Sequence, residues 1–223
     1  HIRKIVGGTG SLNHLPELVA SFGARQVVLI TDPGVYGLGL TKKPEELLRK
    51  AGVSVQVISD VPPEPSVAQV NGILSQARRH NCELLIGLGG GSAMDTTKLI
   101  SILLTNPLKL EQLVKGEKPA TAGIPTLMVP TTAGTGSEAT PNAIVLVPEE
   151  NLKVGIVSDL MIASCVILDP ELTAGLPPQI TANTGIDALC HLMECYISKK
   201  ANPLSDTFAL SGIELVEIGR ASV

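Results

Sequence analysis

Residues 87–98 of this 223-residue chain read Gly87-Leu88-Gly89-Gly90-Gly91-Ser92-Ala93-Met94-Asp95-Thr96-Thr97-Lys98. An apolar run leads into them and a helical pattern follows, so we expect a strand, a tight turn and a helix N-terminus. The first N–H groups of a helix lack an intrahelical acceptor and carry the positive end of its dipole, which suits a pyrophosphate. Ser92 and Asp95 also have capping-box spacing. The alternative is a helix start that needs glycine only for close packing.

The composition restricts the fold and the class of partner. Apolar residues make up 44% of the chain, yet it has no Trp, two Tyr and two Phe, so the core is expected to be aliphatic, as in a parallel sheet covered by helices. The net charge of −4, without a basic stripe, argues against nucleic-acid binding. No apolar run reaches the ~18 residues that a membrane span needs.

Strand and helix patterns alternate along the first three quarters of the chain. Strands are expected at 3–6, 26–31, 53–59, 84–87, 126–129 and 165–168, and helices at 12–22, 44–51, 67–80 and 94–104. This alternation predicts an α/β fold with a doubly wound, mainly parallel, Rossmann-like sheet. Segments 143–147 and 154–157 predict a hairpin. From residue 177 only helices are expected, at 180–197 and 205–218, so we predict an α/β domain over 1–176 and the beginning of an all-helical domain over 177–223.

Two polar segments fall at expected strand ends. Asp32 follows the second strand, where a carboxylate can bind adenosine ribose hydroxyls and favour NAD over NADP; the alternative is a turn residue before proline. The segment Pro130-Thr131-Thr132-Ala133-Gly134-Thr135-Gly136-Ser137-Glu138 places four hydroxyls and two glycines at another strand end. These groups suit a nicotinamide, ribose or phosphate, although an ordinary polar loop has the same composition.

A third segment, Gly185-Ile186-Asp187-Ala188-Leu189-Cys190-His191-Leu192-Met193-Glu194, lies in an expected helix. Asp187 and His191 are four residues apart and therefore share a face, with Glu194 one turn beyond. A carboxylate and an imidazole so placed can hold Fe²⁺ or Zn²⁺, but two ligands make half a site. The alternative is a hydrogen-bonded i,i+4 pair in a packed helix.

Together these segments resemble the iron-containing (group III) alcohol dehydrogenase family. The matching pieces are Gly89–Ser92 with Asp95 and Lys98, the segment 130–138, Asp169-Pro170-Glu171-Leu172-Thr173, and Thr184-Gly185-Ile186-Asp187-Ala188-Leu189-Cys190-His191, in the family's order and spacing. The resemblance implies an NAD(P)-dependent oxidoreductase that interconverts an alcohol and an aldehyde or ketone. Glycerol dehydrogenase, dehydroquinate synthase and maleylacetate reductase share the architecture, but segment 131–138 fits the iron group better.

The resemblance also implies site residues. Gly89, Gly90, Gly91, Ser92 and Asp95 would form the pyrophosphate motif, Asp32 would bind the adenosine ribose, and Thr131, Thr132 and Lys153 would line the nucleotide cleft. Asp187 and His191 match two metal ligands, for Fe²⁺ or alternatively Zn²⁺, and the metal would polarise the substrate oxygen. No residue stands out as a dedicated general base.

The chain departs from the family in length, because the other two metal-binding histidines of the family lie beyond residue 223. We expect a fragment of a longer enzyme; the alternative is a truncated nucleotide-binding module without catalysis. Incompletely covered helices favour a homo-oligomer. The four cysteines have no C-x-x-C spacing, which favours reduced thiols and a cytoplasmic protein. The expected partner is a small alcohol or aldehyde.

Overall fold

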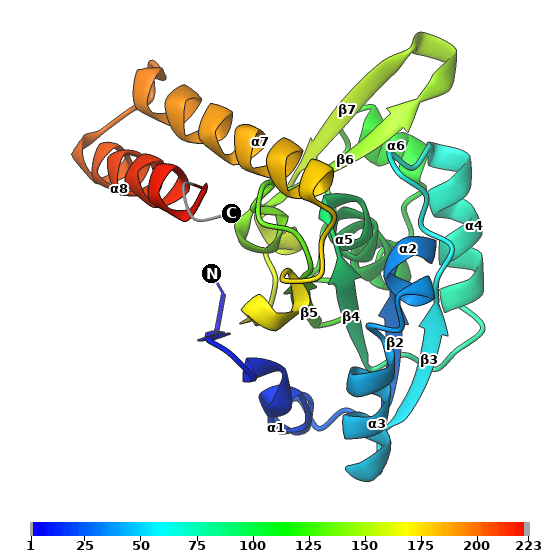
Figure 1. The fold of residues 1–223 in the computed structure, drawn as a ribbon. Coiled ribbons are helices and arrows are strands. Elements are labelled where there is room, and N and C mark those ends of the chain that lie inside the picture. The colour runs from blue at the N-terminus through cyan, green and yellow to red at the C-terminus, as the bar shows by residue number, and fades with distance from the viewer. Residues whose placement is uncertain (1, 221–223) are drawn as a thin grey trace. The chain divides into compact units, whose positions relative to one another are not determined.

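The computed structural model describes residues 2–220 (Figure 1). The chain divides into two compact units. The first contains the residues up to Thr131 together with Ser137–Ala174, and the second contains Thr132–Gly136 together with the residues from Gly175 onward. The hydroxyl-rich segment is therefore shared: its middle belongs to the second unit, whereas both of its ends continue into the first.

The first unit is built on a six-stranded parallel sheet with the order β1-β8-β5-β4-β2-β3. The strands are β1 (Lys4–Gly7), β2 (Gln26–Ile30), β3 (Ser54–Ile58), β4 (Leu84–Gly89), β5 (Thr126–Pro130) and β8 (Cys165–Leu168). This architecture confirms the predicted Rossmann-like α/β class. The strands follow the aliphatic runs of the sequence because both faces of a parallel sheet are covered by helices.

The helices of the first unit are α1 (Leu15–Ser21), α2 (Pro33–Gly37), α3 (Lys42–Lys50), α4 (Val67–Ala77), α5 (Gly91–Thr105) and α6 (Leu110–Val114). Short 3₁₀ turns lie at η1 (Ser11–His14), η2 (Ser137–Ala139), η3 (Pro148–Glu150), η4 (Asp159–Met161) and η5 (Pro170–Leu172).

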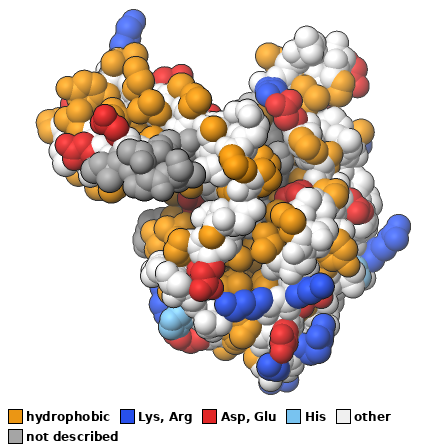
Figure 2. Space-filling view, in the orientation of Figure 1, with side chains coloured by type: hydrophobic (Ala, Val, Ile, Leu, Met, Phe, Trp, Pro, Cys, Tyr) orange, Lys and Arg blue, Asp and Glu red, His pale blue; other side chains and the backbone are white. Residues whose placement is uncertain are grey.

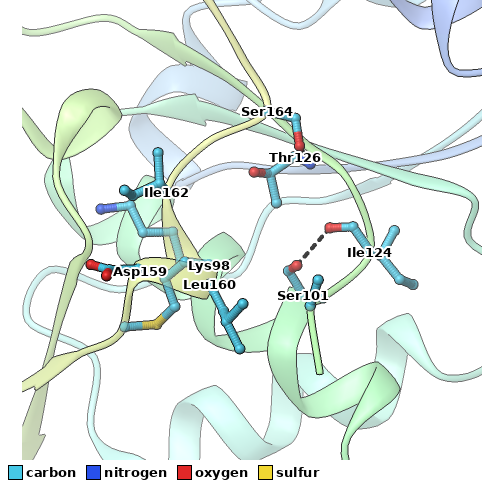
Figure 3. Close-up of a pocket in the computed structure, with 11 residues that line it drawn as sticks. Lys98, Ser101, Ile124, Thr126, Asp159, Leu160, Ile162 and Ser164 are labelled. Carbon is cyan, nitrogen blue, oxygen red and sulfur yellow. Dashed lines mark hydrogen bonds between the residues drawn. The ribbon is translucent and has the colours of Figure 1, made fainter. Parts of the chain in front are cut away.

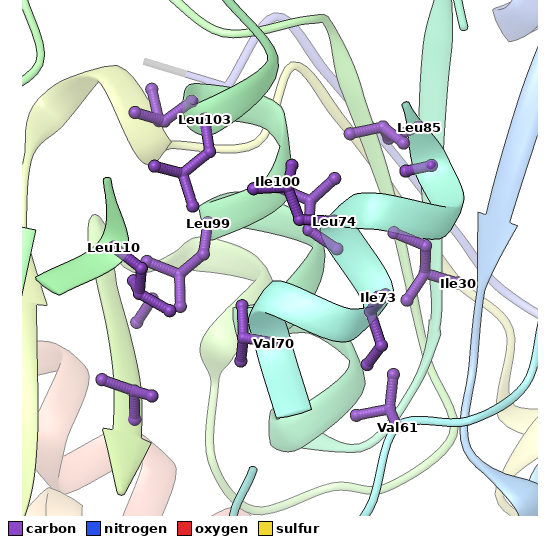
Figure 4. Close-up of a cluster of buried hydrophobic side chains, with 14 of the residues drawn as sticks. Ile30, Val61, Val70, Ile73, Leu74, Leu85, Leu99, Ile100, Leu103 and Leu110 are labelled. Carbon is purple, nitrogen blue, oxygen red and sulfur yellow. The ribbon is translucent and has the colours of Figure 1, made fainter. Parts of the chain in front are cut away.

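Alternate strand residues face two separate aliphatic cores. Val28 and Ile30 of β2 belong to a cluster with residues of α4, α5 and α6, part of which Figure 4 draws. Val27 and Leu29 belong to another cluster with residues of α1 and α3. The period of two along β2 thus gives each helical layer its own core.

A hairpin of β6 (Asn142–Val147) and β7 (Leu152–Val157) stands apart from the main sheet, as predicted. Its β6 strand is tied to the turn after β3, because the Leu146 N–H donates to the Pro65 carbonyl at 3.0 Å. The hairpin, residues 142–157, therefore lies beside the turn that follows β3.

The predicted capping box at Ser92 and Asp95 is wrong. Helix α5 already begins at Gly91 with Gly90 as N-cap, and no side chain caps it. Ser92 Oγ instead accepts a hydrogen bond from the Glu64 N–H at 3.3 Å. The first helical amides of α5 are consequently not covered by a capping side chain.

The second unit contains α7 (Pro178–Ile197) and α8 (Pro203–Arg220). The two helices pack closely at Gly212, where an added Cβ would lie 2.5 Å from Leu192 Cδ2. Large apolar side chains remain exposed on both helices (orange in Figure 2); they are Ile180, Ile186, Met193, Tyr196, Ile197, Leu204, Phe208, Leu210 and Leu215. Within residues 2–220, no helix is both long and apolar enough to cross a membrane.

Candidate functional site

The glycine turn lies where the winding of the sheet reverses. Strand β2 has β3 on one side and β4 on the other, and the chain moves from β4 onward to β5. In such sheets ligands bind beyond the carboxyl ends of the strands at this switch point. Asp32 follows β2 and the glycine turn follows β4, and Ile30 pairs in register with Gly87. The structure thus brings these two predicted elements together.

Gly89 is buried where no larger residue fits. Its φ of +151° is rare for L side chains, and an added Cβ would lie 2.8 Å from Ala93 Cβ and 3.0 Å from Asp32 Oδ2. Glycine at this position therefore lets the end of β4 approach the Asp32 carboxylate and the first turn of α5 closely, and we call these surroundings of Gly89 the cradle. Gly90, Gly91 and Ser92 are half-buried and continue the cradle toward the helix N-terminus.

Asp32 has the turn role that its sequence position suggests, through one of its two carboxylate oxygens. Its Oδ1 accepts a hydrogen bond from the Val35 N–H at 2.9 Å and so caps α2. Its Oδ2 lies on the side of Gly89, as the distance to the added Cβ shows. The turn role is therefore present, and it leaves one carboxylate oxygen directed toward the cradle.

A buried hydroxyl beside the cradle has no partner. Thr31 is fully buried, and its Oγ1 finds no hydrogen-bond partner in residues 2–220. The same atom lies 4.0 Å from the Cβ position built on Gly89. An unpartnered hydroxyl at the place where β4, Asp32 and α5 approach one another fits a polar ligand such as a dinucleotide. Thr131 closes the other side, since its N–H donates to the Gly89 carbonyl at 3.0 Å.

Ser92 and Lys153 are linked through a residue that sequence reasoning missed. Glu64 donates its N–H to Ser92 Oγ, and its carboxylate pairs with Lys153 Nζ at 2.6 Å. Glu64 has a φ of +51°, an uncommon backbone conformation for a residue other than glycine. Its place between Pro63 and Pro65, after β3, is the only sequence signal that pointed to it.

Asp95 and Lys98 lie inside the protein. Asp95 is 8% exposed and Lys98 is 0% exposed, and they form an ion pair at 3.2 Å. Burial lowers the pKa of Lys98, while the neighbouring Asp95 carboxylate opposes that shift. Both Asp95 oxygens already accept hydrogen bonds from within the chain. Asp95 therefore binds partners within the chain, whereas the sequence motif predicted that it takes part in binding the pyrophosphate.

The second unit holds Thr132 and the two expected metal ligands. His191 Nε2 lies 3.9 Å from Asp187 Oδ1, too far for a hydrogen bond, and both side chains are about half exposed. The hydrogen-bonded pair that competes with the metal hypothesis is therefore not formed. The separation lets both atoms reach one ion through bonds of about 2.1 Å. No third His, Cys, Asp or Glu groups with them in the described part of the chain.

A cavity of about 180 Å³ lies elsewhere in the first unit (Figure 3). It is lined by Ser101 of α5, by Thr126 at the start of β5 and by Ser164 just before β8, with Lys98 on its wall. These positions mark the amino ends of the strands. The cavity is thus separate from the glycine turn, which lies at the carboxyl ends.

Comparisons with known proteins give a consistent family. The iron-containing alcohol dehydrogenase model matches residues 3–170, and the model of the C-terminal part of the Fe-containing alcohol dehydrogenase family matches residues 181–220. A choline dehydrogenase of Bacillus subtilis is 41% identical over 210 residues, which cover 93% of this chain and 52% of that protein. The chain spans about half the length of the curated relatives it matches.

Solved structures have the same fold. A 1,3-propanediol oxidoreductase, 36% identical, matches with a TM-score of 0.91 over 96% of this chain and 56% of that one. A sulfoacetaldehyde reductase from Bifidobacterium kashiwanohense in complex with NAD⁺, 33% identical, matches with a TM-score of 0.87 over the same shares.

Proposed function

Because the chain belongs to the iron-containing alcohol dehydrogenase family, as its motifs predicted, we propose that it forms part of an enzyme that interconverts an alcohol and an aldehyde or ketone with NAD. The observation that carries the proposal is the cradle at Gly89, bounded by the Asp32 carboxylate and the unpartnered hydroxyl of Thr31. An unpartnered buried hydroxyl, a carboxylate and uncapped helical amides at the carboxyl ends of the strands suit a dinucleotide, although close packing alone also explains the glycine.

We assign the cofactor contacts to groups around this cradle. The amides at the start of α5, in Gly91 and Ser92, would donate to the pyrophosphate. Asp32 Oδ2 would accept from the adenosine ribose hydroxyls and repel a 2′-phosphate, which favours NAD, with NADP as the weaker alternative. Thr131, Thr132 and Lys153 would line the rest of the cleft. When bound, the nicotinamide supplies the hydride chemistry.

We assign Asp187 and His191 to the metal, as two ligands of an incomplete set. A carboxylate oxygen with an imidazole nitrogen suits Fe²⁺, and Zn²⁺ is the alternative. The metal would act as a Lewis acid on the substrate oxygen. Asp187 and His191 would hold the metal together, because both project from the same face of α7.

We further propose that residues 1–176 form the cofactor-binding domain and that 177–223 begin the metal-binding helical domain. The exposed apolar side chains of α7 and α8 support a homo-oligomer, which sedimentation velocity tests directly. All four cysteines are unpaired, which supports a reducing, cytoplasmic location.

The proposal is tested by measuring three quantities on one purified protein: NADH affinity from the fluorescence of the nicotinamide, metal content, and NADH oxidation with short aldehydes. Binding together with metal and turnover supports the dehydrogenase. Binding without metal or turnover identifies a nucleotide-binding module instead. If NADH does not bind at millimolar concentration, the proposed function is wrong.

A further inference from the structure

Asp95 and Lys98 form a buried ion pair, and the proposed cofactor contacts do not explain why these two charges are buried. We propose that Asp95 and Lys98 are positioning residues that hold segment 131–142 in the shape needed for cofactor binding, without contacting the cofactor themselves. The part of this inference that concerns cofactor rests on the proposed function. The part that concerns the shape of the segment stands on the contacts of the two side chains.

The Lys98 ammonium makes four contacts, and three of them lie in one short stretch of chain. Its Nζ donates to Ser137 Oγ at 2.9 Å, to Thr140 Oγ1 at 3.3 Å and to the Asn142 carbonyl at 2.7 Å. The fourth contact is Asp95 Oδ1 at 3.2 Å. An ammonium group has three protons, so these acceptors share all of its donor capacity. Lys98 therefore has no remaining donor for a ligand.

Asp95 holds the same stretch of chain from a second side. Its Oδ1 accepts from Ser137 Oγ at 2.5 Å, and its Oδ2 accepts from the Ile144 N–H at 3.0 Å. Ser137 thus lies between both charged groups, and Ile144 belongs to β6, which follows the segment directly. Removing either charge leaves the other buried without its partner, which is strongly unfavourable in a low-dielectric interior.

The segment is fixed at both ends in the first unit. At one end, the Thr131 N–H donates to the Gly89 carbonyl at 3.0 Å. At the other end, Ser137 is held by the Asp95–Lys98 pair. The intervening residues Thr132–Gly136 belong to the second unit, where an added Cβ on Gly134 would lie 2.6 Å from the Thr184 carbonyl oxygen. The first unit therefore holds both ends of the segment, whereas its middle packs within the second unit.

Helix α5 supplies a matched control at its opposite end. Asn106 is 5% exposed, and its Nδ2 donates to the Ile102 and Thr121 carbonyls at 3.0 Å. Its Oδ1 accepts from the Ala120 N–H at 3.0 Å. Asn106 is thus another buried polar anchor of a loop on the same helix, and none of these contacts involves segment 131–142.

The experiment compares Lys98→Met, Ser137→Ala and Asn106→Ala with the wild-type protein. Hydrogen exchange by mass spectrometry, without cofactor, reports the order of segment 131–142, and a fluorescence titration reports NADH affinity. Lys98→Met is expected to speed hydrogen exchange in residues 131–142 and to weaken NADH binding about tenfold or more. Ser137→Ala is expected to speed exchange in the same residues and to weaken NADH binding about threefold. Asn106→Ala should lower the melting temperature and speed exchange near residue 120, with NADH affinity within about twofold of wild type.

The outcomes separate the two proposals. Unchanged exchange in 131–142 in both variants overturns the positioning role, whatever the cofactor does. Faster exchange with unchanged NADH affinity overturns the link to cofactor binding while leaving the proposed function intact. If the wild-type protein itself does not bind NADH, the proposed function fails, and the exchange data still decide whether the pair orders the segment. If Lys98→Met does not fold, Ser137→Ala alone decides each question, because it removes one hydroxyl and no charge.

Discussion

At the scale of single residues, one oxygen of Asp32 caps α2 and the other is proposed to bind the adenosine ribose, and a suitable substitution separates these two roles. Asn keeps an oxygen that caps α2 but removes the charge, so Asp32→Asn should keep stability within about 0.5 kcal/mol of wild type. The loss of charge should reduce the preference for NADH over NADPH about tenfold, because repulsion of the 2′-phosphate disappears. The ratio of the two dissociation constants measures this effect.

The matched control is Asp60→Asn. Asp60 follows the neighbouring strand β3, and its Oδ2 accepts from Gln76 Nε2 at 2.9 Å on the surface. This variant removes the same charge, but at the end of a strand further from the cradle. It should therefore change the ratio of the NADH and NADPH dissociation constants much less. Equal ratios in the two variants would show that Asp32 has no specific contact with the ribose.

The cysteines give a second prediction at this scale. Burial raises the pKa of Cys82 to about 11, and it also raises the pKa of Cys165. The thiolate is the reactive form, so at pH 8 about one Cys82 thiol in a thousand is ionised. Ellman's reagent should therefore modify Cys190 and Cys195, which are exposed on α7, well before the other two.

Raising the pH from 8 to 10 should speed the modification of Cys82 strongly, because its thiolate fraction increases with each pH unit below its pKa. The Cys190→Ser and Cys195→Ser variants assign the fast phases. Four thiols with one common rate in the native protein would contradict the burial described for Cys82 and Cys165.

The sequence predicted the glycine turn, Asp32 and the Asp187–His191 spacing because each is a local pattern. It did not predict the buried ion pair or the role of Glu64. Three of the four partners of Lys98 lie 39 to 44 residues away, and Lys153 lies 89 residues from Glu64, so only the folded chain brings them together. A lysine within a polar helical stretch reads as exposed until its acceptors are known.

At the scale of elements, one carboxylate holds η1 to the end of β8, in addition to the pairing of β1 with β8. Asp169 is 3% exposed, and its oxygens accept from the N–H groups of Gly10, Leu12 and Glu171 at 2.9–3.1 Å. Asp169→Ala leaves these donors without a charged acceptor and should lower the free energy of unfolding by about 3 kcal/mol. Urea denaturation measures the loss.

Glu171→Ala is the control at the next turn position. This variant keeps the backbone N–H of residue 171 and loses only the ion pair between Glu171 and Lys43 at 3.7 Å. Both side chains of that pair are about half exposed. Its effect should stay within about 0.5 kcal/mol. If both variants destabilised the protein equally, the hydrogen bonds of Asp169 would not be what holds η1 to β8.

Periodicity predicted the long elements well, including the hairpin and both terminal helices. It missed α2, since a five-residue helix beginning Pro-Gly has too few turns to show a period. It also placed the start of α5 three residues late, at residue 94, because Gly91 and Ser92 have weak helix propensity. Tertiary contacts of Ser92, rather than propensity, fix that boundary.

At the scale of the whole molecule, both assigned metal ligands lie in the second unit, whereas the assigned cofactor contacts other than Thr132 lie in the first, so a substitution at a metal ligand should leave cofactor binding largely intact. His191→Ala should abolish metal retention and turnover, because one of two assigned ligands is lost. NADH affinity should stay within about twofold, since His191 lies outside the glycine cradle. Metal analysis and NADH titration of the same sample measure both effects.

His14→Ala is the control for this variant, because His14 is an exposed histidine that pairs with Glu17 at 3.4 Å in the first unit. It should retain metal, turnover and NADH affinity. A His191→Ala protein that lost NADH binding together with metal would indicate a structural histidine.

We propose that the carboxyl ends of β2 and β4 form the dinucleotide site, and a crystal structure of the protein with NAD⁺ tests this most directly. We expect the pyrophosphate within about 3 Å of the amides at the start of α5, and the adenosine ribose hydroxyls on Asp32 Oδ2. NAD⁺ bound elsewhere, with the Gly89 cradle empty, would contradict it.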